Sequence, residues 1–150
     1  MIWLSEGGLH ERVVEMTARF DRLGETTVRD EGGATDYRWL QWLAVCPYPE
    51  MELGRFQYDE FYERSGGGWQ MVKYAYDLLE LARNSRIALH NHLLTGPTPV
   101  PHAHCEPEVG YPEHDHYRFV ELTVQEALEE HLRWWASETE LTCERLWPLV

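Results

Sequence analysis

The sequence has few cysteines and no long apolar run. Its three cysteines, Cys46, Cys105 and Cys143, are odd in number and widely spaced, which argues against a disulfide framework and favours a reducing compartment. No run approaches the roughly 18 consecutive apolar residues that a membrane span needs. The first nine residues lack the cationic and apolar stretches of a signal peptide. We therefore expect a cytoplasmic protein without a membrane anchor.

Lysine is almost absent and acidic residues dominate. Lys73 is the only lysine among 13 basic residues, against 26 acidic ones, so the formal net charge is −13. Low lysine with many carboxylates suits a salt-loving organism or a GC-rich genome. A strongly acidic surface repels phosphate groups at long range. Composition alone therefore does not suggest nucleic acid as the partner.

The length and apolar content predict one folded domain. A chain of 150 residues fits a single ordinary core, and 43% hydrophobic residues are enough to build one. Ser5 is placed to cap a first helix, whose apolar residues recur at steps of three and four until Gly24 ends it. Residues Gly24 to Asp36 are polar, which predicts a loop.

Aromatic, β-prone segments follow this helix. We expect strands over Tyr37–Val45, Leu53–Glu63, Trp69–Leu81, Arg86–Leu93 and Tyr117–Leu122; for Tyr76–Ala82 the leucines also suit a helix. The five prolines of Thr95–Pro112 predict a structured loop or edge segment. Thr123 and Glu126 form a capping box for a last helix reaching about Trp147. This order predicts an α+β fold, an antiparallel sheet with an N-terminal and a C-terminal helix packed on it.

Histidine is concentrated in one segment as three H-x-H pairs. These pairs are His90 and His92, His102 and His104, and His114 and His116. On extended backbone, residues i and i+2 point to the same side. Two pairs on neighbouring strands can therefore hold a divalent transition metal, with Cys105, Glu106 and Glu108 as further candidate ligands. Alternatively, such a pair acts as general base and general acid, with Arg83, Arg86 and Arg118 neutralising a phosphate.

The spacing of Gly96, His102, His104 and Glu108 resembles the first metal-binding motif of cupins. In that family the two histidines and the glutamate bind a divalent metal inside a jelly-roll barrel. The motif's closing glycine is replaced here by Asp115. This resemblance implies a metalloenzyme.

A longer segment, residues 72–132, resembles the TumE-type toxins of prokaryotic toxin–antitoxin systems. The shared features are alternating tyrosines in a strand, an arginine-bearing strand that leads to an asparagine beside histidine, a Pro-His-x-His segment, and a capped helix. Here they are Tyr74 and Tyr76, Arg86 to His92, Pro101 to His104, and Phe119 to Leu132. Ala103 replaces the middle histidine of the family segment. Residues 1–70 have no counterpart, and their helix packs on the sheet, dimerises or holds a partner.

The TumE resemblance implies an RNA-cleaving toxin neutralised by a cognate antitoxin. The simplest mechanism needs no metal or other cofactor. His102 or His104 would take the 2′-hydroxyl proton, His90 or His92 would protonate the leaving oxygen, and Arg86 would stabilise the transition state. The candidate substrate-binding residues are Tyr74, Tyr76, Arg83, Asn91 and Arg118.

A third hypothesis gives the protein a binding function and no enzymatic activity. Evenly spread carboxylates on a small aromatic-rich protein are typical of an acidic inhibitor that mimics nucleic acid and binds a protein target. This reading does not require the clustered histidines.

Overall fold

The computed structural model describes residues 2–32, 34–47, 53–80, 85–92, 100–106, 115–118 and 123–135. Within these ranges the chain forms two helices and eight strands. In chain order they are β1 (Trp3–Leu4), α1 (Glu6–Asp21), β2 (Glu25–Glu31), β3 (Tyr37–Pro47), β4 (Leu53–Ser65), β5 (Gly68–Glu80), β6 (Ser85–His92), β7 (Val100–Glu106), β8 (Asp115–Arg118) and α2 (Val124–Trp135).

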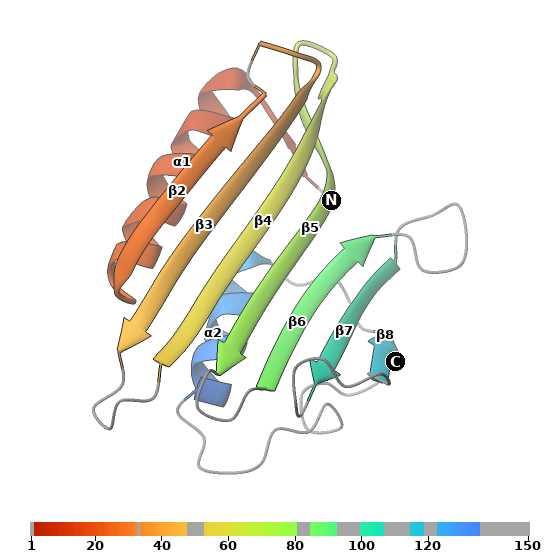
Figure 1. Cartoon of the computed structure of the whole chain (residues 1–150). Helices are drawn as coiled ribbons and strands as arrows, with labels where there is room; N and C mark the ends of the chain where they lie inside the picture. Colours follow the sequence, from red (N-terminus) through yellow and green to blue (C-terminus); the bar gives the residue numbers. More distant parts are fainter. Residues whose placement is uncertain are drawn as a thin grey trace.

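The strands form one antiparallel sheet in which β2 to β8 lie side by side in sequence order (Figure 1). Each pairs with the next strand along the chain, and the short β1 pairs with the beginning of β5, where Trp3 lies opposite Gln70. Antiparallel strands need only short connections, so this order follows from consecutive hairpins. Together with two helices, the sheet makes an α+β fold, as the sequence predicts.

Both helices pack on the same face of the sheet. From α1, the Thr17 hydroxyl accepts a hydrogen bond from Nε1 of Trp42 at 3.2 Å, and Phe20 meets Tyr58 edge-on with ring centroids 5.1 Å apart. From α2, Nδ1 of His131 lies 2.7 Å from the hydroxyl of Tyr58. Figure 1 shows both helices behind the sheet.

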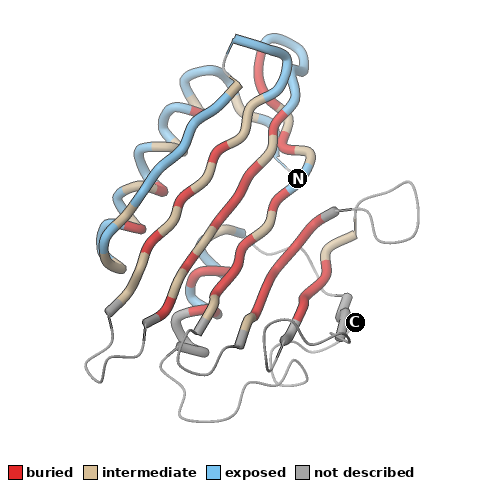
Figure 2. The backbone as a smooth tube through the Cα atoms, in the orientation of Figure 1, coloured by how far each residue is buried: buried red, intermediate tan, exposed pale blue. Residues whose placement is uncertain are grey.

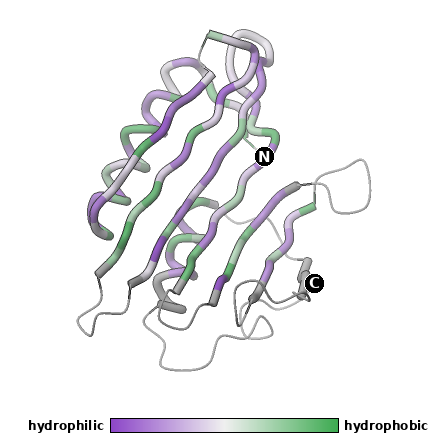
Figure 3. The backbone as a smooth tube through the Cα atoms, viewed as in Figure 1, coloured by the Kyte–Doolittle hydropathy of each residue, from purple (hydrophilic) through white to green (hydrophobic). Residues whose placement is uncertain are grey.

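The main core lies between these helices and the sheet. Alternate residues of β3 and β4 point toward the helices, and Trp42, Phe56, Tyr58 and Tyr62 are fully buried. Figure 2 shows β2 largely exposed and β6 largely buried, and Figure 3 shows the alternation of hydropathy along the strands. The residues between them point to the opposite face, here called the polar face. It carries Trp39, Gln41, Arg55, Gln57, Asp59, Asp77, Arg86, His90, His102 and His104.

The predicted starts of both helices are confirmed, and α1 ends at Asp21, three residues before the predicted Gly24. The hydroxyl of Ser5 accepts a hydrogen bond from the Gly8 amide at 3.0 Å, which caps α1. The Glu126 carboxylate accepts a hydrogen bond from the Thr123 amide at 2.7 Å, and the Glu126 amide donates to the Thr123 hydroxyl at 3.2 Å. This reciprocal pair is the predicted capping box. The predicted extension of the last helix beyond Trp135 lies outside the described residues.

The prediction of a loop over Gly24–Asp36 is wrong for most of that segment. Residues Glu25–Glu31 form β2, which pairs along its whole length with β3. The strand lies at the edge of the sheet and most of its residues are exposed. An edge strand is held by backbone hydrogen bonds to its neighbour and needs little alternation of apolar residues. The polar side chains of β2 therefore gave no pattern from which a strand could be predicted.

The proline-rich segment also contains a strand. Val100–Glu106 forms β7, which lies between β6 and β8. Pro101 is the second residue of this strand, close to the end where a missing N–H disturbs the ladder least. The rest of Thr95–Pro112 lies outside the described residues.

The remaining strand predictions agree closely with the structure. The third predicted strand is β5, and its residues Tyr76–Glu80 are extended rather than helical. The last strand occupies Asp115–Arg118, earlier than the predicted Tyr117–Leu122. Among the described residues, neither helix is both long enough and apolar enough to cross a bilayer.

Candidate functional site

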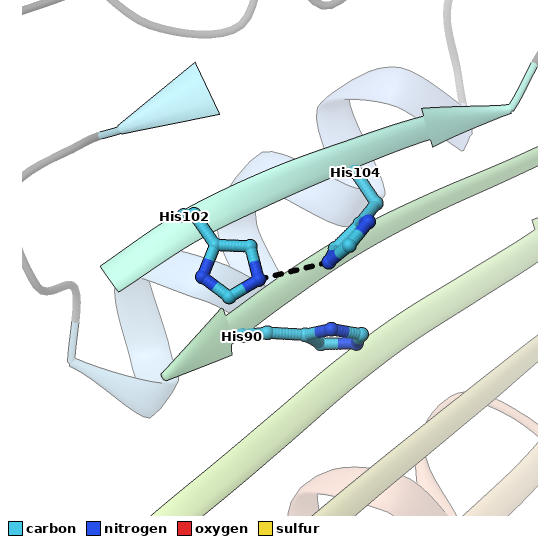
Figure 4. A group of neighbouring side chains, drawn as sticks. All are labelled: His90, His102 and His104. Carbon is cyan, nitrogen blue, oxygen red and sulfur yellow. Dashed lines mark hydrogen bonds between the residues drawn. The ribbon is translucent and has the colours of Figure 1, made fainter. Parts of the chain in front are cut away.

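Three buried histidines converge on the polar face. Strand pairing places His90 of β6 opposite His102 of β7, and His104 lies two residues further along β7. One ring nitrogen from each lies within 4.8 Å of the others. The side chains extend from two neighbouring strands toward one point (Figure 4). Their residues are only 8%, 0% and 7% exposed, so they are packed and not freely solvated.

Hydrogen bonds fix the state of the His102 ring. Its Nδ1 lies 2.7 Å from the carbonyl oxygen of Val100. Because a carbonyl only accepts, Nδ1 carries a proton and donates it. Nε2 of His102 lies 2.8 Å from Nε2 of His104. A hydrogen bond between two ring nitrogens needs one proton, and because Nδ1 of His102 already carries one, the neutral pair has this proton on Nε2 of His104.

His90 is oriented by Asp77, which lies on β5. Its Nε2 is 3.3 Å from Oδ1 of Asp77, so the carboxylate accepts a hydrogen bond from Nε2. Arg86 also donates to this oxygen, from Nε at 2.8 Å. Burial by itself raises the pKa of Asp77, but the bond from His90 and the charge of Arg86 outweigh it and keep that pKa below its ordinary value. The carboxylate is thus charged.

This arrangement matches the needs of a transition-metal centre. Zinc takes imidazole nitrogens at about 2.0–2.1 Å in tetrahedral geometry, which places two ligand nitrogens about 3.4 Å apart. The 2.8 Å between His102 and His104 would widen by about half an ångström, and the three nitrogens, now within 4.8 Å of one another, would close toward this spacing. Metal-ligating histidines usually donate their other N–H to a carboxylate or a carbonyl. Asp77 and Val100 offer these two partners.

The structure separates the predicted substrate-binding residues of β5 and β6 from the histidines. Tyr74 and Tyr76 are each 2% exposed and lie on the helix side of the sheet, and Asn91, opposite Tyr74 in the register, lies on that side too. The hydroxyl of Tyr76 donates to Glu60 at 2.7 Å. None of these three side chains is on the polar face.

The other candidate residues are placed only in part. His92 lies opposite Val100 at the end of β6, and His116 and Arg118 of β8 lie opposite His104 and His102. Cys105 and Glu106 belong to β7. The remaining candidates lie outside the described residues and are Arg83, Glu108, His114, Gly96 and Cys143.

Sequence reasoning missed Asp77, which links His90 to Arg86. A usable signal was present, because Asp77 alternates with the apolar residues Tyr76 and Leu78 and must face away from them on a strand. Nothing in the sequence shows that β6 places a histidine beside it.

A second buried polar group lies on the helix face. The Glu60 carboxylate is fully buried and forms an ion pair with Arg12 of α1. It also accepts hydrogen bonds from the hydroxyls of Tyr62 at 2.6 Å and Tyr76 at 2.7 Å. The charge-assisted bonds join α1 to three positions of the sheet, so this group stabilises the fold.

His131 of α2 is also fully buried on this face. Burial lowers its pKa from 6.5 to about 4, so the ring is neutral at pH 7. Its Nδ1 meets the Tyr58 hydroxyl, while its Nε2 is buried without a hydrogen-bond partner.

No family model, curated protein or solved structure matches this chain.

Proposed function

We propose that this chain is a metalloprotein in which His90, His102 and His104 hold one divalent transition metal of the zinc type. The observation that carries this proposal is the convergence of three buried imidazoles within 4.8 Å. In addition, one ring nitrogen of His90 is hydrogen-bonded to the Asp77 carboxylate, and one of His102 to the Val100 carbonyl. The metal would lie between Nε2 of His102 and Nε2 of His104, and the proton held there would move to Nδ1 of His104.

Three protein ligands leave one position of a tetrahedral zinc open. Zinc in such a site lowers the pKa of a bound water to about 7 and polarises carbonyl or phosphoryl oxygens. We infer a hydrolytic activity on this basis. In this chain Asp77 orients His90, the Val100 carbonyl orients His102, and Arg86 holds the Asp77 carboxylate in place.

Metal stoichiometry tests the proposal directly. The purified chain is stripped with a chelator, reloaded with Zn²⁺ or Co²⁺, freed of excess by gel filtration and analysed for metal. We expect about one equivalent of metal per chain and, for Co²⁺, the visible absorption of a tetrahedral ion. His90→Ala, His102→Ala and His104→Ala should each lose the metal.

His10→Ala is the matched control, because His10 is exposed on α1 and should not affect metal content. Full metal content in all three site variants would overturn the proposal. His116→Ala belongs in the same series, since His116 lies opposite His104 in the register. A loss of metal there would extend the ligand set to β8.

The second candidate function is metal-free RNA cleavage by the same histidines, as the TumE resemblance implies. The observation that favours it is the 2.8 Å contact between Nε2 of His102 and Nε2 of His104, because a base and an acid in contact can pass a proton. One of them would take the 2′-hydroxyl proton as that oxygen attacks phosphorus. His90 or His92 would give a proton to the leaving 5′-oxygen, with Arg86 beside the phosphate and an antitoxin as the cellular partner.

RNA cleavage in EDTA separates the two candidates. The RNase proposal expects cleavage in EDTA that is abolished by His102→Ala or His104→Ala and retained by His10→Ala. Absence of cleavage in EDTA, together with one bound metal, would exclude the RNase and support the metal centre.

A further inference from the structure

The polar face carries a second group of functional side chains next to the histidines. Pairing across the sheet places Arg55 of β4 opposite Leu79 of β5, and Leu79 opposite Arg86 of β6. The neighbouring row runs from Gln57 through Asp77 and Ala88 to His104. Arg55 therefore shares the face of the histidines and lies three strands away from His104.

Arg55 differs from the other half-buried arginines of the described residues. Arg12, Arg19, Arg38 and Arg86 each form an ion pair with a carboxylate. Among those same residues no carboxylate pairs with Arg55. Its one hydrogen bond runs from Nη2 to Oε1 of Gln57 at 3.1 Å, and its Nε is buried without a partner. The chain has 26 acidic residues, so a half-buried cation with no counter-ion in the described part of the chain is unusual.

Neutral side chains hold this guanidinium in place. Nε2 of Gln57 donates to Oδ2 of Asp59 at 3.0 Å, which turns Oε1 of Gln57 toward Arg55. The other oxygen of Asp59 accepts from Nε1 of Trp39 and Nε2 of Gln41, both at 2.8 Å. The Asp59 charge is thus shared among three neutral donors. The side-chain amide of Gln57 thus positions Arg55 without neutralising its positive charge, so the guanidinium can still pair with an anion.

We propose that Arg55 binds an oxyanion, a phosphate or a carboxylate group, of a small ligand that lies along the polar face toward His104. A guanidinium presents several N–H donors in a fork that matches such groups. Adjacent strands lie about 4.8 Å apart, so three spacings separate the two backbone positions by roughly 14 Å. Side chains stand roughly perpendicular to a sheet, so the guanidinium and the imidazole project from the same face at about this separation, which fits a phosphorylated or carboxylated metabolite-sized molecule.

Arg86 does not serve this purpose equally well, because Asp77 already neutralises it at 2.7 Å. The binding of the oxyanion needs only Arg55 and its neighbours. The role of the ligand as a substrate rests on the proposed metal centre. Oxyanion binding at Arg55 can therefore be tested without the metal, and a failure of one proposal does not decide the other.

The test is an NMR titration of the metal-free chain with inorganic phosphate and, in parallel, with acetate. The Arg55 Nε–Hε signal is the direct readout in the wild type, because this Nε is buried without a partner. Backbone amide signals next to position 55 report the affinity in the variants that lack this group. We expect a saturable shift of the Arg55 signal with at least one of these anions. Arg55→Gln should weaken this binding by about tenfold or more, and Arg55→Lys should restore part of it.

Arg22→Gln is the matched control, because Arg22 is an exposed arginine at the end of α1 and should leave the affinity unchanged. Equal affinity in Arg55→Gln and the wild type, or a shift of Arg55 no larger than that of Arg22, would overturn the proposal. A thermal melt of each variant confirms folding. The zinc content of Arg55→Gln should equal that of the wild type, so loss of the oxyanion site is distinguishable from loss of the metal centre.

Discussion

The Nε2 atoms of His102 and His104 lie 2.8 Å apart, although both residues belong to one strand and only Ala103 separates them. The Val100 carbonyl holds the opposite nitrogen of His102 at 2.7 Å, which aims its Nε2 at His104. With His90 reaching in from β6, the pair becomes a three-nitrogen site. A site already oriented in this way loses little conformational freedom when it binds a metal.

Zinc should stabilise the folded chain. At a free concentration 100 times the dissociation constant, a ligand that binds only the folded state adds about 2.7 kcal/mol to the free energy of unfolding. For a domain of this size we expect Tm to rise by about 5–10 °C. Differential scanning fluorimetry with and without Zn²⁺ measures this rise. The same rise in His104→Ala would contradict a role for the histidines, and His10→Ala should behave as the wild type.

Asp77→Asn should weaken metal binding without abolishing it. The amide retains the shape of the side chain but lacks the charge that strengthens the His90 ligand, and loss of such outer-shell partners typically costs about 10–100-fold in affinity. Competition with a chromophoric chelator measures the change. Asp59→Asn is the matched control, because Asp59 has the same 7% exposure on the same face. An equal loss in both variants would show a general effect of the polar face.

Glu60→Gln should destabilise the fold strongly. The change leaves the half-buried Arg12 without its counter-charge, and breaking a buried ion pair on one side typically costs about 3–5 kcal/mol. Urea unfolding measures the free energy. Glu15→Gln removes an exposed i,i+4 pair with Arg19, for which we expect less than about 1 kcal/mol. A loss in Glu60→Gln as small as in Glu15→Gln would contradict the anchoring role of the network.

His131 should make stability depend on pH in the acid range. Its pKa falls from 6.5 to about 4 on folding, so the unfolded chain binds the proton first. Stability is therefore complete above about pH 6.5 and falls as the pH decreases toward about 4. Each pKa unit corresponds to about 1.4 kcal/mol, so the loss approaches about 3 kcal/mol.

His131→Gln removes this proton and should flatten that part of the profile. Urea unfolding at several pH values between 4 and 7 compares the variant with His10→Gln, where we expect the wild-type slope. Identical slopes in all three proteins would show that His131 is not the titrating group.

Gly24→Ala should destabilise the turn between α1 and β2. A Cβ at this position would lie 2.1 Å from the carbonyl oxygen of Val45, so the backbone must shift. Gly7→Ala is the opposite case, because its Cβ meets nothing closer than 4.0 Å on an exposed helical turn. There we expect stabilisation of about 0.5–1 kcal/mol. Thermal melts of both variants should show shifts of opposite sign.

The sequence was sufficient for elements whose signals are local. Ser5 and the Thr123–Glu126 pair marked two helix starts, because a cap is made by residues three positions apart. Alternation of apolar and polar residues located β3, β4 and β5. The sequence did not predict β2 and β7 as strands. An edge strand and a strand that contains proline are stabilised by pairing with neighbours that are distant in the sequence. Local propensity does not contain those contacts.

For the site, the sequence by itself determined that His102 and His104 share a side, because side chains on extended backbone repeat every two residues. Only the tertiary structure decided which third histidine joins them. The register of β6 against β7 places His90 opposite His102, and a slip of one residue would send it to the other face. The register of β5 against β6 brings Asp77 to His90. Tyr74 and Tyr76 of β5 face the helices, because the face that a strand buries depends on the whole sheet.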